Sequence, residues 1–276
     1  MTLRKYSAAG ADRRARDSRE IAHSVPVPNA RLPLDILHAD GQYLIINKTA
    51  GMVSQPGLGH TQDTVLNAAF GRYGHQLRTL GAKRDWGLRQ RLDKPTSGAM
   101  VLALTPESYD HLRELFQARR VKKEYLALVH GRPKPGSGKI EARLVETDTG
   151  VKRVVISASG QDALTYYWTL ASGDDASLVR IEIVTGRLHQ IRAHMMFIGN
   201  SLVGDALYPQ LRSPSAPRGG DDFNLHCRML EFIYPQADRP SRFLAPLPKS
   251  FAAAARKLGI SLPPTLSAPS ENVKRP

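Results

Sequence analysis

Gly98-Ala-Met-Val-Leu-Ala-Leu104, followed directly by Thr105-Pro106-Glu107, is the stretch of sequence that decides the fold class. The first part is apolar throughout, which predicts a strand buried on both faces. Threonine is a favoured helix cap and proline a favoured first helical residue, so a helix should begin at this point. One buried face of that helix is predicted by four residues at helical spacing: Tyr109, Leu112, Leu115 and Phe116.

Short apolar or alternating runs on both sides of this stretch predict further strands. They are expected at residues 44–46, 122–129, 151–157, 163–171, 177–184 and 225–233. Helices are expected at residues 64–73, with Thr64 as the candidate cap, after Gly186 and from about Pro248. Loops are expected at residues 74–86, 133–138 and 209–222. Strands dominate without regular βα alternation, which predicts an α+β fold on a mixed, largely antiparallel sheet with flanking helices.

Composition narrows the class of partner. The chain carries 39 Lys and Arg against 25 Asp and Glu, a formal net charge of +14. Such a charge attracts polyanions, so nucleic acid is the first candidate and an anionic membrane surface the second. Cys227 is the only cysteine, which excludes an internal disulfide and favours a reducing compartment. Gly57-Leu58-Gly59 lacks the third glycine of a dinucleotide motif, so no nucleotide cofactor is expected.

The domain organisation follows from shifts in composition. Residues 1–31 are charged and poor in large apolar groups, and they are expected to form a flexible basic arm. Residues 32–260 should form one domain, and the Pro- and Ser-rich residues 261–276 a disordered tail. No apolar run approaches the roughly 20 residues of a membrane helix. No apolar segment follows the basic residues at the start, as a secretory signal requires, so we expect a cytoplasmic protein.

Asp93 is the first candidate for chemistry. It lies between the basic residues 74–86 and a buried strand, next to the small residues Thr96, Ser97 and Gly98. Small side chains suit a place where a ligand approaches the backbone closely. For an aspartate taken alone, however, a turn with a salt-bridge partner is the stronger interpretation.

Arg192 and Tyr125 change that balance. Arg192 is predicted on the side of its helix opposite the apolar stripe, where either a catalytic role or a solvated helix face would explain it. An arginine close to Asp93 would favour the charged carboxylate. Tyr125 shares its predicted strand face with Ala127 and Val129, so it should point inward as a core aromatic or as a ring that stacks on a base.

Metal and serine-hydrolase chemistry receive little support. His189 and His194 are five residues apart, not the four that align two ligands on a helix, and His226 and Cys227 should diverge on a strand. A zinc deaminase needs a Cys-x-x-Cys pair that one cysteine cannot supply. A Ser–His–Asp site at Ser97 lacks the nucleophile-elbow pattern.

Five ordered blocks resemble the RluA family of pseudouridine synthases over residues 33–252. They resemble the family patterns N-K-P-x-G, H-R-L-D-x-x-T-S-G, K-x-Y-x-A, T-G-R-x-H-Q-I-R-x-H and G-x-x-L-x-G-D-x-x-Y. They stand here at residues 47–51, 90–98, 123–127, 185–194 and 199–208. Two positions depart from the pattern: Gln90 replaces His, and Thr49 replaces Pro. Residues 1–31 are too few for the S4 module of some relatives, so the subgroup without it is expected.

The resemblance implies a central RNA-binding cleft in a catalytic domain at residues 32–260, and no cofactor. It implies that Asp93 is the essential aspartate, Tyr125 the active-site tyrosine and Arg192 the basic partner of that aspartate. Arg91 corresponds to the arginine that replaces the target base in the RNA stack. Further RNA contacts are expected at Lys48, Gln90, Arg187 and His189, although Lys48 could also be a supporting or simple surface lysine. We expect a monomer acting on ribosomal or transfer RNA, with a non-catalytic RNA-binding protein as the alternative.

Overall fold

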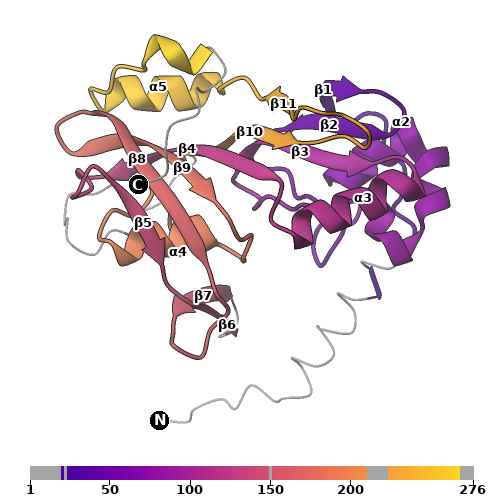
Figure 1. Cartoon of the computed structure of the whole chain (residues 1–276), viewed down its shortest axis with the longest axis horizontal. Coiled ribbons are helices and arrows are strands. Elements are labelled where there is room, and N and C mark those ends of the chain that lie inside the picture. Colours follow the sequence, from indigo (N-terminus) through magenta and orange to yellow (C-terminus); the bar gives the residue numbers. More distant parts are fainter. Residues whose placement is uncertain (1–19, 22–23, 149–150, 210–222, 268–276) are drawn as a thin grey trace. The chain divides into compact units, whose positions relative to one another are not determined.

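The computed structural model describes residues 20–21, 24–148, 151–209 and 223–267, which belong to two compact units. The first unit comprises the chain up to Lys94 together with Met100–Glu114. The second comprises Pro95–Ala99 and the chain from Leu115 onward. The chain therefore passes between the units three times: after Lys94, within strand β3 (Ser97–Ala103) and within helix α3 (Pro106–Gln117). Both elements are labelled in Figure 1.

The first unit is built on the strand order β1-β2-β3, with β1 and β2 antiparallel. Besides most of β3 and α3, it contains β1 (Asp35–Ala39), β2 (Tyr43–Lys48), α2 (Val65–Leu80) and a 3-10 helix (Ala82–Gly87). The predicted strands at 44–46 and 98–104 and the helix start at Pro106 are confirmed. Strand β1 was missed because it is largely exposed and carries no buried stripe.

Helix α2 confirms one prediction and corrects another. Thr64 caps it as expected: its Oγ1 accepts from the Asn67 amide at 3.3 Å, and Asn67 Oδ1 accepts from the Thr64 amide at 3.1 Å. The loop predicted at residues 74–86 is wrong. The helix continues to Leu80 with one irregular residue, Tyr73, because Leu77 and Leu80 are buried and outweigh the weak helix propensity of Gly74.

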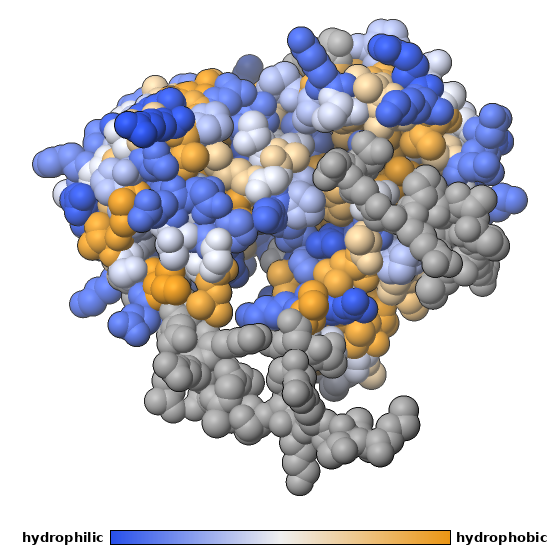
Figure 2. Space-filling view, turned by 180° about the vertical axis from the view of Figure 1, so that it is seen from behind, coloured by the Kyte–Doolittle hydropathy of each residue, from blue (hydrophilic) through white to orange (hydrophobic). Residues whose placement is uncertain are grey.

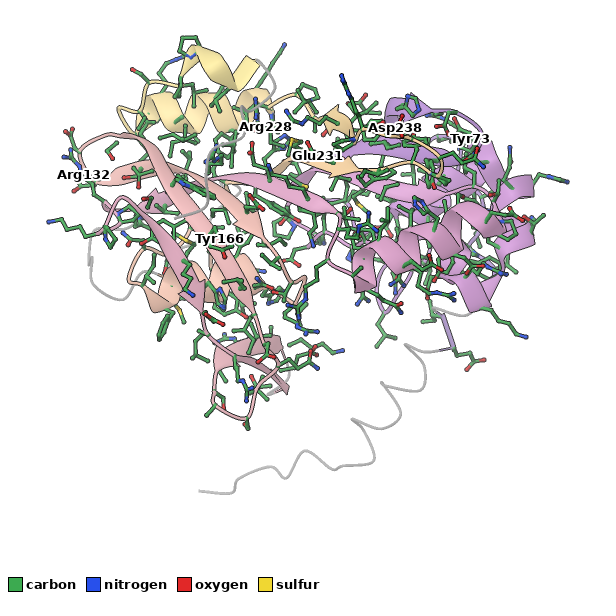
Figure 3. The ribbon with its side chains drawn as sticks, in the orientation of Figure 1. Tyr73, Arg132, Tyr166, Arg228, Glu231 and Asp238 are labelled. Carbon is green, nitrogen blue, oxygen red and sulfur yellow. The ribbon has the colours of Figure 1, made fainter. Side chains whose placement is uncertain are left out.

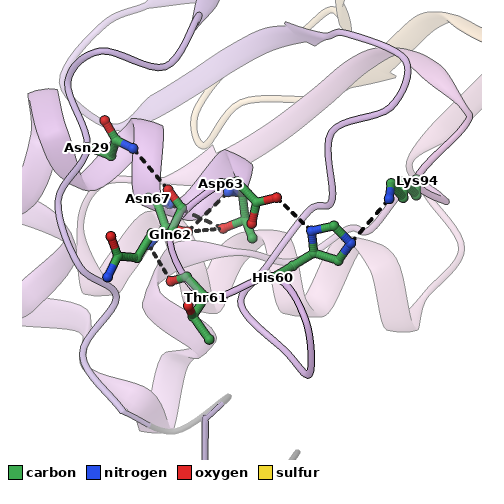
Figure 4. Close-up of polar contacts among 8 residues, drawn as sticks. Asn29, His60, Thr61, Gln62, Asp63, Asn67 and Lys94 are labelled. Carbon is green, nitrogen blue, oxygen red and sulfur yellow. Dashed lines mark hydrogen bonds and ion pairs between the residues drawn. The ribbon is translucent and has the colours of Figure 1, made fainter.

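Residues 27–30 pack against α2. The Asn29 amide donates to the Asn67 carbonyl at 2.9 Å, and Asn67 Nδ2 donates to the Val27 carbonyl at 2.8 Å. Asn29 Nδ2 donates to the Gln62 carbonyl at 3.0 Å (Figure 4). A Cβ at Gly71 would lie 2.5 Å from the Ala30 amide nitrogen, so glycine is required at this crossing. Most of the predicted arm lies outside the described residues, and its boundary at residue 31 stays a prediction.

The second unit is built on the strand order β3-β10-β4-β9-β8-β5, with β11 beside β10 and β6-β7 forming a separate pair. Only β3 and β10 are parallel among the described pairs of this unit, so the predicted mixed, largely antiparallel sheet is confirmed. The strands are β4 (Lys122–His130), β5 (Ser137–Glu141), β6 (Leu144–Asp148), β7 (Lys152–Ile156), β8 (Leu164–Ser172), β9 (Ala176–Ile183), β10 (Leu225–Phe232) and β11 (Ser241–Leu244). Helices α4 (Gln190–Phe197) and α5 (Lys249–Lys257) follow the predicted positions, whereas β5, β6 and β11 were missed.

Helix α5 covers one face of this sheet. Leu126 and Leu128 of β4 pack there against Phe251 and Ala255 of α5. Arg228 of β10, labelled in Figure 3, donates to Glu124 Oε1 at 2.9 Å and to the carbonyl of Leu266 at 2.8 Å. Leu266 belongs to a 3-10 helix (Pro264–Ser267) within the predicted tail, of which residues 268–276 lie outside the described part.

The surface in Figure 2 shows hydrophilic and hydrophobic residues interspersed over the face that is drawn. Across the described ranges, none of the helices combines the length and apolarity needed to cross a bilayer. Within the same ranges, no group of three or more His, Cys, Asp or Glu side chains is arranged to hold a metal ion.

Candidate active site

Asp93 lies between two residues whose backbones are anchored within the first unit. Leu92 is fixed by Ser54, whose Oγ donates to its carbonyl at 2.8 Å and accepts from its amide at 3.1 Å. The carbonyl of Lys94 accepts from the Gly51 amide at 2.8 Å and from Lys48 Nζ at 3.2 Å. Asp93 itself is half-buried, so it combines a fixed backbone with access to solvent. This arrangement suits a carboxylate that must meet a substrate in one geometry.

Lys48 is a buried component of this anchor. The residue is 1% exposed, so the surface-lysine alternative is wrong. Its ammonium donates to the carbonyls of Thr49 at 2.9 Å, Met52 at 2.7 Å and Lys94 at 3.2 Å. Three bonds use all three ammonium hydrogens, which favours a supporting role over a phosphate contact. Burial lowers the pKa of Lys48 to about 7, against the opposing charge of Asp93.

This burial predicts a pH dependence of stability. The lysine pKa is about 7 in the folded chain and 10.5 at its ordinary value, so the unfolded chain binds more protons between these pH values. The free energy of unfolding of the wild type should therefore rise with pH in this window relative to Lys48→Met, by at most ~1.4 kcal/mol per pH unit. Urea unfolding of both proteins at several pH values measures the difference. A difference that stays constant or falls with pH would contradict the prediction.

The side chain of Lys94 extends the anchor to the loop before α2. Its Nζ lies 3.2 Å from His60 Nε2, and His60 Nδ1 lies 2.6 Å from Asp63 Oδ2 (Figure 4). A lysine donating to Nε2 requires the other ring nitrogen to carry the hydrogen, which it then donates to Asp63. This hydrogen bond lowers the pKa of Asp63. The residue after Asp93 is thus held through both its backbone and its side chain.

The two residues that precede Leu92 differ in exposure. Gln90, at the position where the family pattern has His, is buried, whereas Arg91 is exposed. An exposed arginine is suited to reach into an RNA stack. The RNA-binding roles of Gln90 and Arg91 stay predictions.

In the second unit, the turn before α4 is organised by Thr185 and Gln190. Thr185 Oγ1 accepts from the Leu164 amide at 3.0 Å and donates to Gln190 Oε1 at 2.7 Å. Gln190 Oε1 also accepts from the Arg187 amide at 3.1 Å. His189 has a left-handed backbone, with φ at 48°, and its Nδ1 lies 3.1 Å from the hydroxyl of Tyr208. The turn leaves Arg187 exposed and His189 half-buried, and their RNA contacts stay predictions.

Arg192 forms a buried ion pair with Asp205. Its Nε and Nη2 donate to the two carboxylate oxygens at 2.7 and 2.8 Å. The guanidinium carbon also lies 5.1 Å from the ring centre of Tyr208 and 5.2 Å from that of Phe223. Arg192 is 6% exposed, so the alternative of a solvated helix face is wrong. The position of the predicted apolar stripe did not indicate that Arg192 is buried, because α4 is buried around most of its circumference.

Tyr125 lies in the middle of β4, opposite Ile181 of β9 and Cys227 of β10. It is buried, as predicted, although the strand is buried on both faces and not on one. Lys48, Gln90, Arg91 and Asp93 belong to the first unit, whereas Tyr125, Arg187, His189 and Arg192 belong to the second. The convergence of these two sets on one RNA-binding cleft stays a prediction.

Ser97 has a histidine partner, but the pair has a structural and not a catalytic role. Ser97 Oγ lies 2.9 Å from His226 Nδ1, and His226 Nε2 lies 3.2 Å from the Ala245 carbonyl. Both residues are buried, and burial lowers the pKa of His226 to about 4. The ring is thus neutral near pH 7 and is oriented by a carbonyl where a hydrolytic triad has a carboxylate.

Three residues had no predicted role: Ser54, Asp205 and Lys123, the last of which is buried on β4 two residues before Tyr125. Asp205 and Lys123 lie within the quoted motifs, at residues 199–208 and 123–127. The motifs therefore marked both residues but did not indicate what either of them does. Ser54 acts through backbone groups of Leu92, 38 residues along the chain, and such a contact leaves no sequence pattern.

Known proteins resemble this chain closely enough to define its family. A family model described as RNA pseudouridylate synthase matches residues 42–196. The ribosomal large subunit pseudouridine synthase D of Blochmanniella floridana is 35% identical, over 84% of this chain and 75% of that relative. The uncharacterized RNA pseudouridine synthase YjbO of Bacillus subtilis is 33% identical, over 80% of this chain and 75% of its own length.

Solved structures agree with this result. The human RNA pseudouridylate synthase domain containing 4 is 27% identical, with a TM-score of 0.65, over 83% of this chain and 94% of its own. The human RNA pseudouridylate synthase domain containing 1 is 25% identical, with a TM-score of 0.60, over 80% of this chain and 86% of its own. The chain belongs to the RluA family of RNA pseudouridine synthases, which confirms the predicted family and α+β fold. It is an isomerase that modifies RNA.

Proposed function

We propose that this enzyme converts a specific uridine of large-subunit ribosomal RNA to pseudouridine, with Asp93 as the catalytic residue. Two relatives that are 35% identical, from Blochmanniella floridana and Xylella fastidiosa, carry the name ribosomal large subunit pseudouridine synthase D. The observation that carries the catalytic assignment is the anchoring of Leu92 and Lys94 on either side of a half-buried Asp93. A net charge of +14 supports binding to the RNA backbone. We further propose a cytoplasmic monomer that uses no cofactor.

The reaction must break the N1–C1′ bond, turn the uracil, join C5 to C1′ and remove the C5 proton. A stacked base cannot do this, so the nucleotide is flipped out, at a cost of a few kcal/mol. Asp93 then attacks C1′ as a nucleophile or removes a sugar proton to give a glycal-like intermediate. In both routes its carboxylate acts in the charged form, and Arg192 is proposed to favour that form.

The other residues divide between base and backbone contacts. Tyr125 stacks on the flipped base and assists the final deprotonation. Arg91 fills the space that the base leaves in the stack, and Gln90, Arg187 and His189 bind neighbouring parts of the RNA. Lys48 holds the carbonyl of Lys94 and so positions Asp93, which is its role in place of a phosphate contact.

Pseudouridine mapping in total RNA from cells with and without this gene tests the proposal. One ribosomal site in the large subunit should lose its modification in the deletion strain and regain it when the wild-type gene is returned. A site lost from transfer RNA would move the substrate to that class. Unchanged modification everywhere would favour the alternative, a non-catalytic RNA-binding protein on the same scaffold.

A further inference from the structure

Lys123 is a buried cation two residues before Tyr125 on β4. Side chains alternate along a strand, so Lys123 and Tyr125 lie on one face of the sheet. The other face carries Glu124, which binds Arg228, and Leu126, which packs in the cluster beneath α5. Lys123 therefore shares the face of the proposed active-site tyrosine, while Glu182, opposite Glu124 on the neighbouring strand, is near enough to attract its charge.

The surroundings of its ammonium leave a place for a ligand. Nζ lies 5.7 Å from the ring centre of Phe116, and a Cβ at Gly186 would lie 3.9 Å from Nζ. Gly186 is exposed and has no side chain, and Arg187 beside it is exposed as well. Within the described residues, the Lys123 ammonium makes no hydrogen bond and no ion pair, although the residue is 6% exposed.

A largely buried ammonium that has no hydrogen-bonding partner in the protein opposes folding, because its desolvation is only partly offset by nearby charges. Burial lowers the pKa of Lys123 to about 8, while the nearby Cys227 and Glu182 act in the opposite direction. The group is thus still mostly protonated at neutral pH. Groups of this kind are retained where a ligand supplies the missing partner.

We propose that Lys123 binds a backbone phosphate of the target nucleotide, at the turn formed by Thr185, Gly186 and Arg187. A flipped nucleotide carries its phosphate with it, and RNA offers this anion at every residue. The missing side chain of Gly186 lets the phosphate approach the ammonium, and Arg187 supplies a second cation at the same turn. The inference deepens the proposed function and depends on it for the choice of substrate.

Lys123→Met, Lys123→Arg and wild type are compared on an unmodified in vitro transcript of large-subunit ribosomal RNA. KM for tritium release should rise ~10-fold in Lys123→Met, with kcat within ~3-fold of wild type, and Lys123→Arg should recover most of the loss. The slope of log binding constant against log salt should fall by ~0.7–0.9 in Lys123→Met, the value for one lost phosphate contact. The free Lys123→Met protein should melt at the same or a higher temperature than wild type, because an unpaired charge is removed.

Lys122→Met is the matched control, since Lys122 is the preceding residue on the same strand and points to the other face. Lys122→Met should keep the wild-type KM, and its salt slope should lie closer to that of the wild type than the slope of Lys123→Met does. Gly186→Ala tests the same contact without removing the charge, because it places a methyl group beside the ammonium. This variant also keeps the proposal testable if Lys123→Met does not fold.

Wild-type KM and salt slope in Lys123→Met would overturn the inference, as would lower stability with no change in RNA binding. Failure of the proposed function is recognised separately, because the wild type itself would then release no tritium from the ribosomal transcript. If the wild type acts on transfer RNA transcripts, the same series on those transcripts decides the role of Lys123.

Discussion

Asp93→Asn is expected to lower tritium release from [5-³H]uridine-labelled RNA by roughly four orders of magnitude or more. Asparagine keeps the size of the side chain and the anchored backbone on either side, but it removes the negative charge and the nucleophilic oxygen. RNA binding should stay within ~3-fold of wild type, because phosphate contacts dominate affinity. Single-turnover tritium release and a direct binding measurement on the same transcript separate the two effects.

Asp238→Asn is a matched control, since Asp238 is exposed in the turn between β10 and β11, labelled in Figure 3. It makes the same chemical change at an exposed residue that has no proposed role in the site, and it should leave tritium release and RNA affinity unchanged. Normal release by Asp93→Asn would exclude both the nucleophilic and the glycal route. Equal loss in both variants would point to a general effect of lost negative charge.

The sequence predicted those parts of the fold in which local pattern and burial agree. Strands β2, β3, β9 and β10 are continuous apolar or alternating runs, and Thr64 and Thr105 are helix-capping residues. Strands β1, β5 and β11 carry few buried residues, so hydrophobic periodicity gave no signal for them. Residues 74–86 were misassigned because glycine and basic residues indicate a loop locally, whereas burial of Leu77 and Leu80 extends the helix.

The sequence proposes the residues of the candidate site but does not predict the contacts that hold them. Asp93, Tyr125 and Arg192 stand in recognisable motifs, whereas their environments depend on contacts distant in sequence. Lys48 is held by three backbone carbonyls, and any residue type provides a carbonyl, so no pattern could predict that contact. Asp205, the partner of Arg192, lies 13 residues further along the chain, beyond the helical spacing from which the arginine was interpreted.

The ion pair between Arg192 and Asp205 allows stability and catalysis to be separated. Arg192→Met leaves a buried carboxylate without its cation, although the amides of Leu207 and Tyr208 still donate to it at 2.9 and 3.0 Å. Loss of one partner of a buried pair should lower the free energy of unfolding by roughly 3 kcal/mol. Asp162→Asn is the control, because its ion pair with Arg143 is largely exposed, and it should have no measurable effect.

The double variant Arg192→Met/Asp205→Asn decides what Arg192 contributes beyond stability. With both charges removed, no carboxylate stays buried unpaired, and the free energy of unfolding should return to within ~1 kcal/mol of wild type. Activity should not return, because the cation that we propose keeps Asp93 charged is still absent. We expect a loss of roughly 100-fold in kcat in both the single and the double variant. Urea unfolding and single-turnover tritium release on the same three proteins measure the two quantities. If the double variant regained activity together with stability, Arg192 would have only a structural role. Asp93 would then need another basic partner.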